Sequence, residues 1–147
     1  MKRVETLKEL IKYAFSEERG LVKLELGEIK DVIASTIEES TGFKLENYVH
    51  VVDNYAIRHT IAEHGSPQKE AKRGQIAIEV NDFKLISEII TSPDAVYYEK
   101  KNNLGLPVLI YEKTICDKIF YLEEIRTGRK ELAMQTMYKR KTSTRKK

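Results

Sequence analysis

The three histidines of the chain, His50, His59 and His64, fall within one stretch of fifteen residues. Imidazole has an unperturbed pKa of roughly 6.5, so it can take up or release a proton near neutral pH. In a helix over residues 54–64, His64 continues the apolar stripe and points toward a sheet, whereas His59 lies about 140° away around the helix axis. The two therefore cannot bind zinc as an i,i+4 pair does. We expect acid–base chemistry at His64; the plainer alternative is a histidine that only caps or packs the helix end.

Cations gather beside these histidines. Arg58 directly precedes His59, and Lys69, Lys72 and Arg73 follow in a segment with almost no apolar residues. Such a concentration of positive charge could bind the phosphates of an anionic ligand. In the alternative reading, two glutamates of the same stretch neutralise part of the charge and the segment is merely solvated.

Hydroxyls and further cations occur near the C-terminus. Thr136 and Tyr138 stand two residues apart, so they share one face of a predicted strand and could donate hydrogen bonds to a phosphate. Arg126, Arg129 and Lys130 place three cations at a predicted hairpin. Threonine and tyrosine are also ordinary strand residues, so this pattern alone does not establish a function.

The composition is that of one folded domain. Of 147 residues, 41% are hydrophobic and 33% are charged, which is enough apolar material for a core. No apolar run is long enough to cross a membrane, and the N-terminus is charged where a signal peptide would be apolar. The single cysteine excludes an internal disulfide, and with three histidines it excludes a cysteine-rich zinc module. We expect a cytoplasmic protein with no metal, no cofactor and no membrane partner.

The last ten residues carry six basic residues and no acid, including Lys139 and Arg140. Without them the rest of the chain has 20 basic and 23 acidic residues, a net charge of −3. A basic tail of this kind either contacts a phosphate backbone or is a solvated, disordered end. We expect a single domain over residues 1–141 and a disordered tail over residues 142–147.

The spacing of apolar residues predicts helices first and strands afterwards. Helices are expected over residues 4–16, 28–41 and 54–64, the last with Asp53 as N-cap and Gly65 as a left-handed C-cap. A basic surface loop follows over residues 66–74. A fourth helix is expected from Asn81 or Asp82 to Ser92-Pro93.

Four strands rich in Val, Ile, Tyr and Phe are predicted after Pro93. Their ranges are 96–100, 108–113, 118–126 and 130–138. The short connections between them permit only antiparallel neighbours. The predicted fold is therefore α+β, with N-terminal helices packed on one face of a four-stranded antiparallel sheet.

Two motifs resemble a known nuclease group. They are the helix end Arg58-His59-x-x-x-x-His64-Gly65 and the hairpin Arg126-Thr127-Gly128-Arg129-Lys130-Glu131-Leu132. With residues 48–57, 72–76, 124–125, 133 and 136–139, they look like the phage-associated barnase, EndoU, colicin and RelE-like (BECR-fold) nucleases. The similarity covers roughly residues 25–141.

This resemblance implies a metal-independent endoribonuclease in which the ribose 2′-hydroxyl attacks the adjacent phosphorus. His64 would be the general acid or base, with His59 as second choice for the other proton transfer. Arg58 and Arg126 would clamp the phosphate, Thr136 would stabilise the oxyanion, and Tyr138 would stack or donate a proton. The remaining cations would hold the RNA backbone: Lys69, Lys72, Arg73, Arg129, Lys130, Lys139 and Arg140.

The implied partners are RNA, with tRNA as one candidate, and an inhibitory immunity or antitoxin protein, for an effector carried by a phage or a toxin system in bacteria. The rival reading is a catalytically inactive domain of the same fold that binds nucleic acid or joins a phage particle. The ribonuclease reading requires that His64, Thr136 and Arg126 meet in one solvent-accessible hollow.

Overall fold

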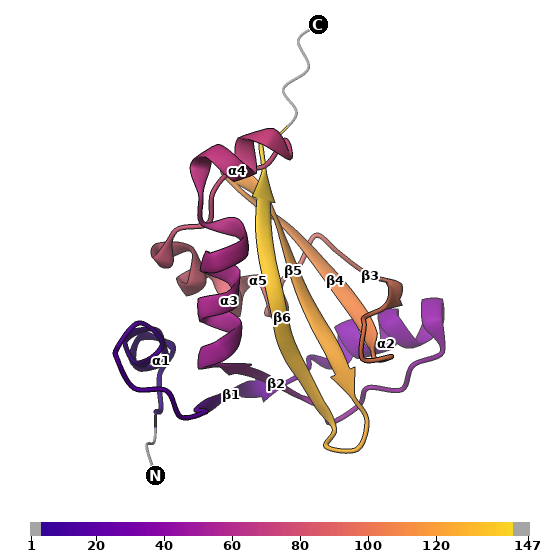
Figure 1. Cartoon of the computed structure of the whole chain (residues 1–147). Coiled ribbons are helices and arrows are strands. Elements are labelled where there is room, and N and C mark those ends of the chain that lie inside the picture. The colour runs from indigo at the N-terminus through magenta and orange to yellow at the C-terminus, as the bar shows by residue number, and fades with distance from the viewer. Residues whose placement is uncertain (1–3, 143–147) are drawn as a thin grey trace, which may run out of the picture.

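The computed structural model describes residues 4–142, so all but the first residue of the expected tail lies outside the described residues. The chain folds as a six-stranded mixed sheet with helices packed around it (Figure 1). The helices are α1 (Leu7–Ala14), α2 (Asp31–Thr41), α3 (Asn54–His64), α4 (Pro67–Lys72), the 3-10 helix η1 (Val80–Leu85) and α5 (Ile86–Thr91). The strands are β1 (Lys23–Glu28), β2 (Val49–Asp53), β3 (Ala95–Lys101), β4 (Pro107–Ile115), β5 (Asp117–Arg126) and β6 (Glu131–Arg140).

The sheet has the order β1-β2-β6-β5-β4-β3, which corrects the expectation of four strands. The C-terminal strands β3 to β6 form the expected antiparallel meander. The N-terminal half adds β1 and β2, and β2 pairs in parallel with β6 from Val49↔Glu131 to Val51↔Ala133. The α+β class is confirmed, but the sheet is mixed and larger than predicted.

One face of the sheet is covered and the other is open. On β5, Ile119, Tyr121 and Ile125 are almost fully buried in the core that the helices cover. Each such apolar side chain contributes about 1.5–3 kcal/mol relative to exposure. The alternate residues of β5, among them Phe120 and Leu122, point to the opposite side. In Figure 1 no helix of the described chain crosses that side of β6, β5 and β4. We call this side the open face.

The segment expected as a basic loop is partly the helix α4. The Ser66 hydroxyl accepts a hydrogen bond from the Lys69 N–H at 3.3 Å, and Pro67 occupies the first helical turn. A serine N-cap followed by a proline, whose ring fixes φ near the helical value, is a common way for a helix to begin. The helix is attached through a buried carboxylate, Glu70, rather than through an apolar stripe, which is why periodicity missed it.

One helix cap and one helix start also differ from expectation. Gly65 has φ −97°, so it is not a left-handed cap. It is required for space, because a Cβ there would lie 2.5 Å from the carbonyl oxygen of Ile61. The fourth helix begins earlier than predicted, as the 3-10 turn η1 with Glu79 as its N-cap, and Asp82 completes the capping box from within. No helix in the described part is both long and apolar enough to cross a membrane.

Candidate active site

His64 lies at the last residue of α3, where this helix meets the border of the open face. The helix starts where expected, because the Asp53 carboxylate accepts a hydrogen bond from the Ala56 N–H at 2.8 Å. The His64 ring packs against the ring of Tyr138 on β6, with centroids 5.5 Å apart and planes tilted by 33°. Its side chain keeps 12% of its surface exposed, so the ring is neither sealed in the core nor free in solvent.

The buried carboxylate of Glu70 fixes the His64 ring. Glu70 is fully buried, and its Oε1 lies 3.1 Å from His64 Nδ1. A carboxylate only accepts hydrogen bonds, so Nδ1 carries a proton and donates it to Glu70. The other carboxylate oxygen accepts a hydrogen bond from Arg73 Nη1 at 2.9 Å. Arg73 Nη1 is also 3.4 Å from His64 Nδ1, but that nitrogen already donates to Glu70 and has no lone pair free. The Nε2 atom of His64 is left for proton transfer.

Tyr138 is part of an aromatic stack on the open face. Its ring stacks on Phe120 of β5, with centroids 4.8 Å apart and an angle of 13° between planes. The Arg140 guanidinium lies 5.5 Å from the Phe120 centroid and 5.8 Å from that of Tyr138, and Lys118 Nζ lies 5.6 Å from Phe120. These are cation–π distances. Arg140 therefore stands beside the Tyr138 ring that touches His64, and Lys118 stands beside the Phe120 ring stacked on it.

Burial raises the pKa of the Tyr138 phenol above its usual 10, although the nearby Arg140 charge partly opposes the increase. Tyr138 is therefore a neutral phenol at physiological pH and able to donate a hydrogen bond or a proton. Next to it, Tyr97 of β3 donates a hydrogen bond to the Glu112 carboxylate, and Lys118 Nζ lies 3.1 Å from the same group. Burial and this hydrogen bond to Glu112 raise the pKa of Tyr97.

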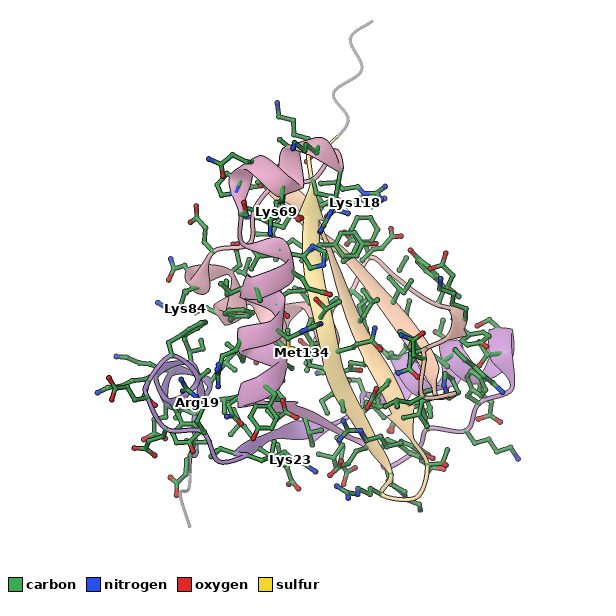
Figure 2. The ribbon with its side chains drawn as sticks, in the orientation of Figure 1. Arg19, Lys23, Lys69, Lys84, Lys118 and Met134 are labelled. Carbon is green, nitrogen blue, oxygen red and sulfur yellow. The ribbon has the colours of Figure 1, made fainter. Side chains whose placement is uncertain are left out.

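Arg126 does not lie near His64, which corrects the expected grouping. It pairs with Glu131 at the closed end of the β5–β6 hairpin, seven residues before Tyr138 along β6. At about 3.3 Å per residue this separates it from Tyr138 by roughly 20 Å. Its Nε donates to Glu124 Oε2 at 2.7 Å. Figure 2 shows the two ends: Lys118 lies toward α4, and Lys23, which pairs with Glu131, lies at the other end.

Thr136 does share the α3 side of β6 with Tyr138, but it is 7% exposed. Its hydroxyl oxygen lies 3.4 Å from that of Thr60 on α3, at the packed interface between helix and strand. The expected role as an oxyanion donor does not fit this burial, because a phosphate cannot reach the hydroxyl without displacing the helix.

Arg58 and His59 line a surface hollow that does not include His64. Arg19, which Figure 2 labels beside α1, lines this shallow hollow with them, as do Tyr55 and Ala62. His59 Nε2 pairs with the Glu63 carboxylate at 3.2 Å. The same Glu63 oxygen lies 3.8 Å from His64 Nε2, so the two imidazoles stand within about 7 Å of each other with one carboxylate between them. They differ in exposure, because the His59 side chain is 56% exposed and that of His64 is 12% exposed.

The expected backbone-binding cations divide into different places. Lys69 and Lys72 are exposed on α4, and Arg140 stands on the aromatic stack, so these three border His64. Arg73 is held by Glu70. Lys139 points away from the open face and pairs with Asp82 at 3.0 Å, which contradicts its expected role. Arg129 and Lys130 are exposed at the far hairpin, with Arg126.

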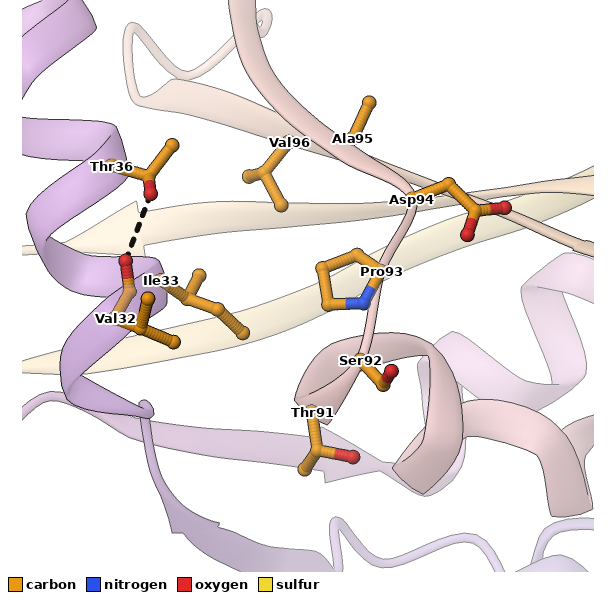
Figure 3. Close-up of a pocket in the computed structure, with 9 residues that line it drawn as sticks. All are labelled: Val32, Ile33, Thr36, Thr91, Ser92, Pro93, Asp94, Ala95 and Val96. Atoms are coloured by element: carbon orange, nitrogen blue, oxygen red, sulfur yellow. Dashed lines mark hydrogen bonds between the residues drawn. The ribbon is translucent and has the colours of Figure 1, made fainter.

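A deeper hollow lies outside this region, between α2 and the connection from α5 to β3 (Figure 3). Val32, Ile33 and Pro93 are among its lining residues, and Asp94 is the one titratable side chain among the described residues that line it. The Asp94 carboxylate already accepts a hydrogen bond from the Thr114 N–H at 2.8 Å. This hollow therefore offers no acid–base pair. Within residues 4–142 no group of three or more His, Cys, Asp or Glu side chains could hold a metal ion.

The chain matches the model of one protein family over residues 27–147, described as phage-Barnase-EndoU-ColicinE5/D-RelE like nuclease 3. It belongs to this nuclease family. The match includes α3, α4 and strands β3 to β6, and therefore every residue around His64, whereas α1 precedes it. No curated protein and no solved structure matches the chain.

Sequence reasoning missed four residues of this candidate site: Glu70, Lys118, Phe120 and Glu112. The alternation of β5 was a usable signal, because Phe120 pairs with Tyr138 and Lys118 with Arg140 once the hairpin register is known. Glu70 gave no such signal, since an acid in a charged segment reads as solvated. Sequence reasoning also grouped His50 with the other histidines, but its Nδ1 lies 2.7 Å from Glu123 Oε2 and both side chains are buried in the core.

Proposed function

We propose that this nuclease cleaves RNA without a metal ion, by attack of the ribose 2′-hydroxyl on the adjacent phosphorus. The observation that supports it best is the position of His64. Its ring is held at Nδ1 by the buried Glu70 and packs on Tyr138 at the border of the open face. Acid–base catalysis requires an imidazole that is held in a fixed orientation at one ring nitrogen, while the other ring nitrogen makes no hydrogen bond to a carboxylate.

The chemistry divides among three groups. His64 Nε2 takes the proton of the 2′-hydroxyl while O2′ bonds to phosphorus and the bond from phosphorus to O5′ breaks. The neutral Tyr138 phenol is placed to donate a proton to the leaving O5′ or a hydrogen bond to a phosphate oxygen. Arg140 and Lys118 stabilise the charge that grows on the phosphorane, where one well-placed donor contributes about 3 kcal/mol. The products carry a 2′,3′-cyclic phosphate and a 5′-hydroxyl.

Arg140 and Lys118 take over the phosphate-binding role that the sequence assigned to Arg58 and Arg126. Lys69 and Lys72 on α4 extend the positive surface past His64, where the RNA backbone would leave the open face. Each phosphate that these cations bind steepens the dependence of binding on salt. In bacteria, an inhibitory immunity or antitoxin protein would block the reaction by covering this same face, and a tRNA is one candidate substrate.

The test compares two histidines of one helix. Purified wild type, His64→Ala and His59→Ala are incubated with total RNA in the presence of EDTA, and circular dichroism checks that each variant is folded. We expect wild type and His59→Ala to cut RNA and His64→Ala to lose at least about a hundredfold of the rate, the lower range for a general acid or base.

Three results would overturn the proposal: full activity in His64→Ala, equal losses in the two variants, or no cutting once EDTA is added. RNA binding by wild type with no cleavage would instead favour the rival reading, an inactive nucleic-acid-binding domain.

A further inference from the structure

The open face carries two β-bulges, one on β3 and one on β6. On β3, Tyr98 pairs with Leu109 and Lys100 with Val108, so Glu99 is an extra residue without a partner. On β6, Gln135 is the extra residue, because Thr136 pairs with Leu122 and Met134 with Glu123. Bulges redirect side chains and are over-represented next to active sites.

The two bulged residues line the same hollow. It lies across the open face and is lined by the apolar Val108, Ile110 and Leu122. Its polar lining consists of Glu99, Lys100, Lys101, Asn102 and Gln135. It is a small hollow of about 70 Å³ that opens to solvent, so a ligand would lie partly in it and partly above it. A flat apolar surface bordered by polar side chains suits an unstacked nucleobase, which needs stacking on its faces and hydrogen bonds at its edge.

A hydrogen-bond network fixes which end of the Gln135 amide faces the hollow. Asn102 Oδ1 accepts from the backbone N–H groups of Leu104 and Leu106, both at 3.0 Å, so its Nδ2 must point the other way. That Nδ2 donates to Glu124 Oε1 at 2.8 Å and to Gln135 Oε1 at 3.1 Å. The carbonyl oxygen of Gln135 is thereby occupied, and the amide presents N–H donors to the hollow.

Arg126 is the outer member of this network. It donates to the second oxygen of Glu124 at 2.7 Å and so holds the carboxylate that orients Asn102. The residue that the sequence placed at the phosphate therefore supports the hollow instead. Gln135 and Tyr138 are three residues apart on β6, about 10 Å, which places the hollow beside the proposed cleavage site on one continuous surface.

We propose that this hollow reads the base of an RNA nucleotide next to the cleaved phosphate and selects the keto bases guanine and uracil. The inference rests on the proposed function, whose site it completes. Keto bases present a carbonyl acceptor next to a ring N–H donor. Gln135 donates to that carbonyl, and the Glu99 carboxylate accepts from the N–H. Adenine and cytosine present an amino donor next to a ring-nitrogen acceptor. Their amino group would therefore face the Gln135 donor, and their ring nitrogen would face the Glu99 carboxylate.

The experiment replaces the donor and leaves the catalytic groups unchanged. Wild type, Gln135→Met and Gln135→Glu cut a random-sequence RNA, and sequencing of the ends gives the relative kcat/KM for each base around the cut. Gln135→Met keeps the length of the side chain without its donors, and Gln135→Glu replaces them with an acceptor. Asn103→Asp, an exposed neighbour in the β3–β4 turn, controls for added charge, and thermal melting confirms that each variant is folded.

We expect wild type and Asn103→Asp to favour guanine or uracil at one position by about tenfold, as one hydrogen bond of typical strength gives. Both Gln135 variants lose that preference and keep their rate at adenine and cytosine. The inference is overturned if wild type cuts next to all four bases equally, or if the preference survives in Gln135→Met.

Binding separates this inference from the proposed function. Fluorescence anisotropy measures the affinity of His64→Ala for short adenine oligoribonucleotides with a central guanine, uracil or cytosine. Tighter binding of guanine and uracil that disappears in the double variant with Gln135→Met supports the hollow even if wild type cuts nothing. Equal affinity for all the oligonucleotides, without cleavage by wild type, overturns both proposals.

Discussion

Replacement of Glu70 tests how His64 is oriented. Glu70→Gln keeps the shape of the side chain but removes the charge between His64 and Arg73, and Glu70→Ala removes both hydrogen bonds. The carboxylate is fully buried and accepts hydrogen bonds at 3.1 Å and 2.9 Å. A hydrogen bond to a charged group contributes about 1.5–3 kcal/mol. Because the Arg73 side chain is 47% exposed, solvent screens that interaction and the lower end of the range applies to it.

The two hydrogen bonds together give an expected loss of about 3–4 kcal/mol in the free energy of unfolding for Glu70→Ala, and about 1–2 kcal/mol for Glu70→Gln. For activity, a catalytic group that is displaced by about 1 Å can lose a hundredfold in rate. We therefore expect kcat/KM on an RNA oligonucleotide to fall about a hundredfold in Glu70→Ala and about tenfold in Glu70→Gln.

Urea unfolding gives the stability of each variant, and cleavage under conditions where all are folded gives the rate. Glu63→Gln is the matched control, because Glu63 is 49% exposed and its Oε1 lies 3.8 Å from His64 Nε2. We expect it to change the rate by less than about threefold, since exposed ion pairs contribute little. Wild-type kcat/KM in a folded Glu70→Gln variant, with His64→Ala inactive, would refute the orienting role of Glu70.

Three further predictions concern stability and binding. Burial raises the pKa of four tyrosines above the unfolded value of 10, namely Tyr97, Tyr111, Tyr121 and Tyr138. Their neutral forms stabilise the fold fully below pH 10, and stability is lost as the pH rises above it. The loss is about 1.4 kcal/mol per pH unit for each of the fully buried Tyr111 and Tyr121, and smaller for Tyr97 and Tyr138, whose phenols solvent partly screens. Urea unfolding from pH 8 to 11 measures the slope, and a flat profile contradicts it. His50→Ala leaves the buried Glu123 carboxylate without its histidine partner, so we expect the free energy of unfolding in urea to fall by about 3–5 kcal/mol. A fall of less than about 1 kcal/mol would show that the pair is not isolated from water. Replacing Lys69 and Lys72 by alanine should reduce the slope of log affinity for RNA against log salt by about 0.7 for each phosphate that the variant no longer binds, whereas an unchanged slope would place the RNA away from α4.

The sequence predicted the parts of the fold that local signals determine. The limits of α3 agree with prediction because Asp53 caps its start and Gly65 ends it, and the meander agrees because short turns join alternating strands. The strand β2 was not predicted, because three of its five residues are buried in succession and its sequence therefore does not alternate between apolar and polar residues. Its parallel partner β6 lies about eighty residues away in the chain, so no turn marks the pairing.

The candidate site was predicted only where one helix or one strand determines the position. The helical stripe placed His64 against the sheet, and strand alternation put Thr136 and Tyr138 on one side of β6. The error at Arg126 was avoidable, because residues beside a hairpin turn are farthest from the open end of its strands. Glu99 and Gln135 could not be recognised, because a bulge depends on pairing with another strand and leaves no pattern in its own sequence.

The central claim is that His64 activates a ribose hydroxyl, and a substrate without that hydroxyl tests it most directly. Wild type is given an RNA oligonucleotide with one preferred cleavage position, and a second oligonucleotide with a single 2′-deoxynucleotide there; mass spectrometry identifies the product ends. We predict a 2′,3′-cyclic phosphate and a 5′-hydroxyl from the first, and no cut at that position in the second. Cleavage beside the deoxynucleotide, or products with 5′-phosphate ends, would contradict the mechanism.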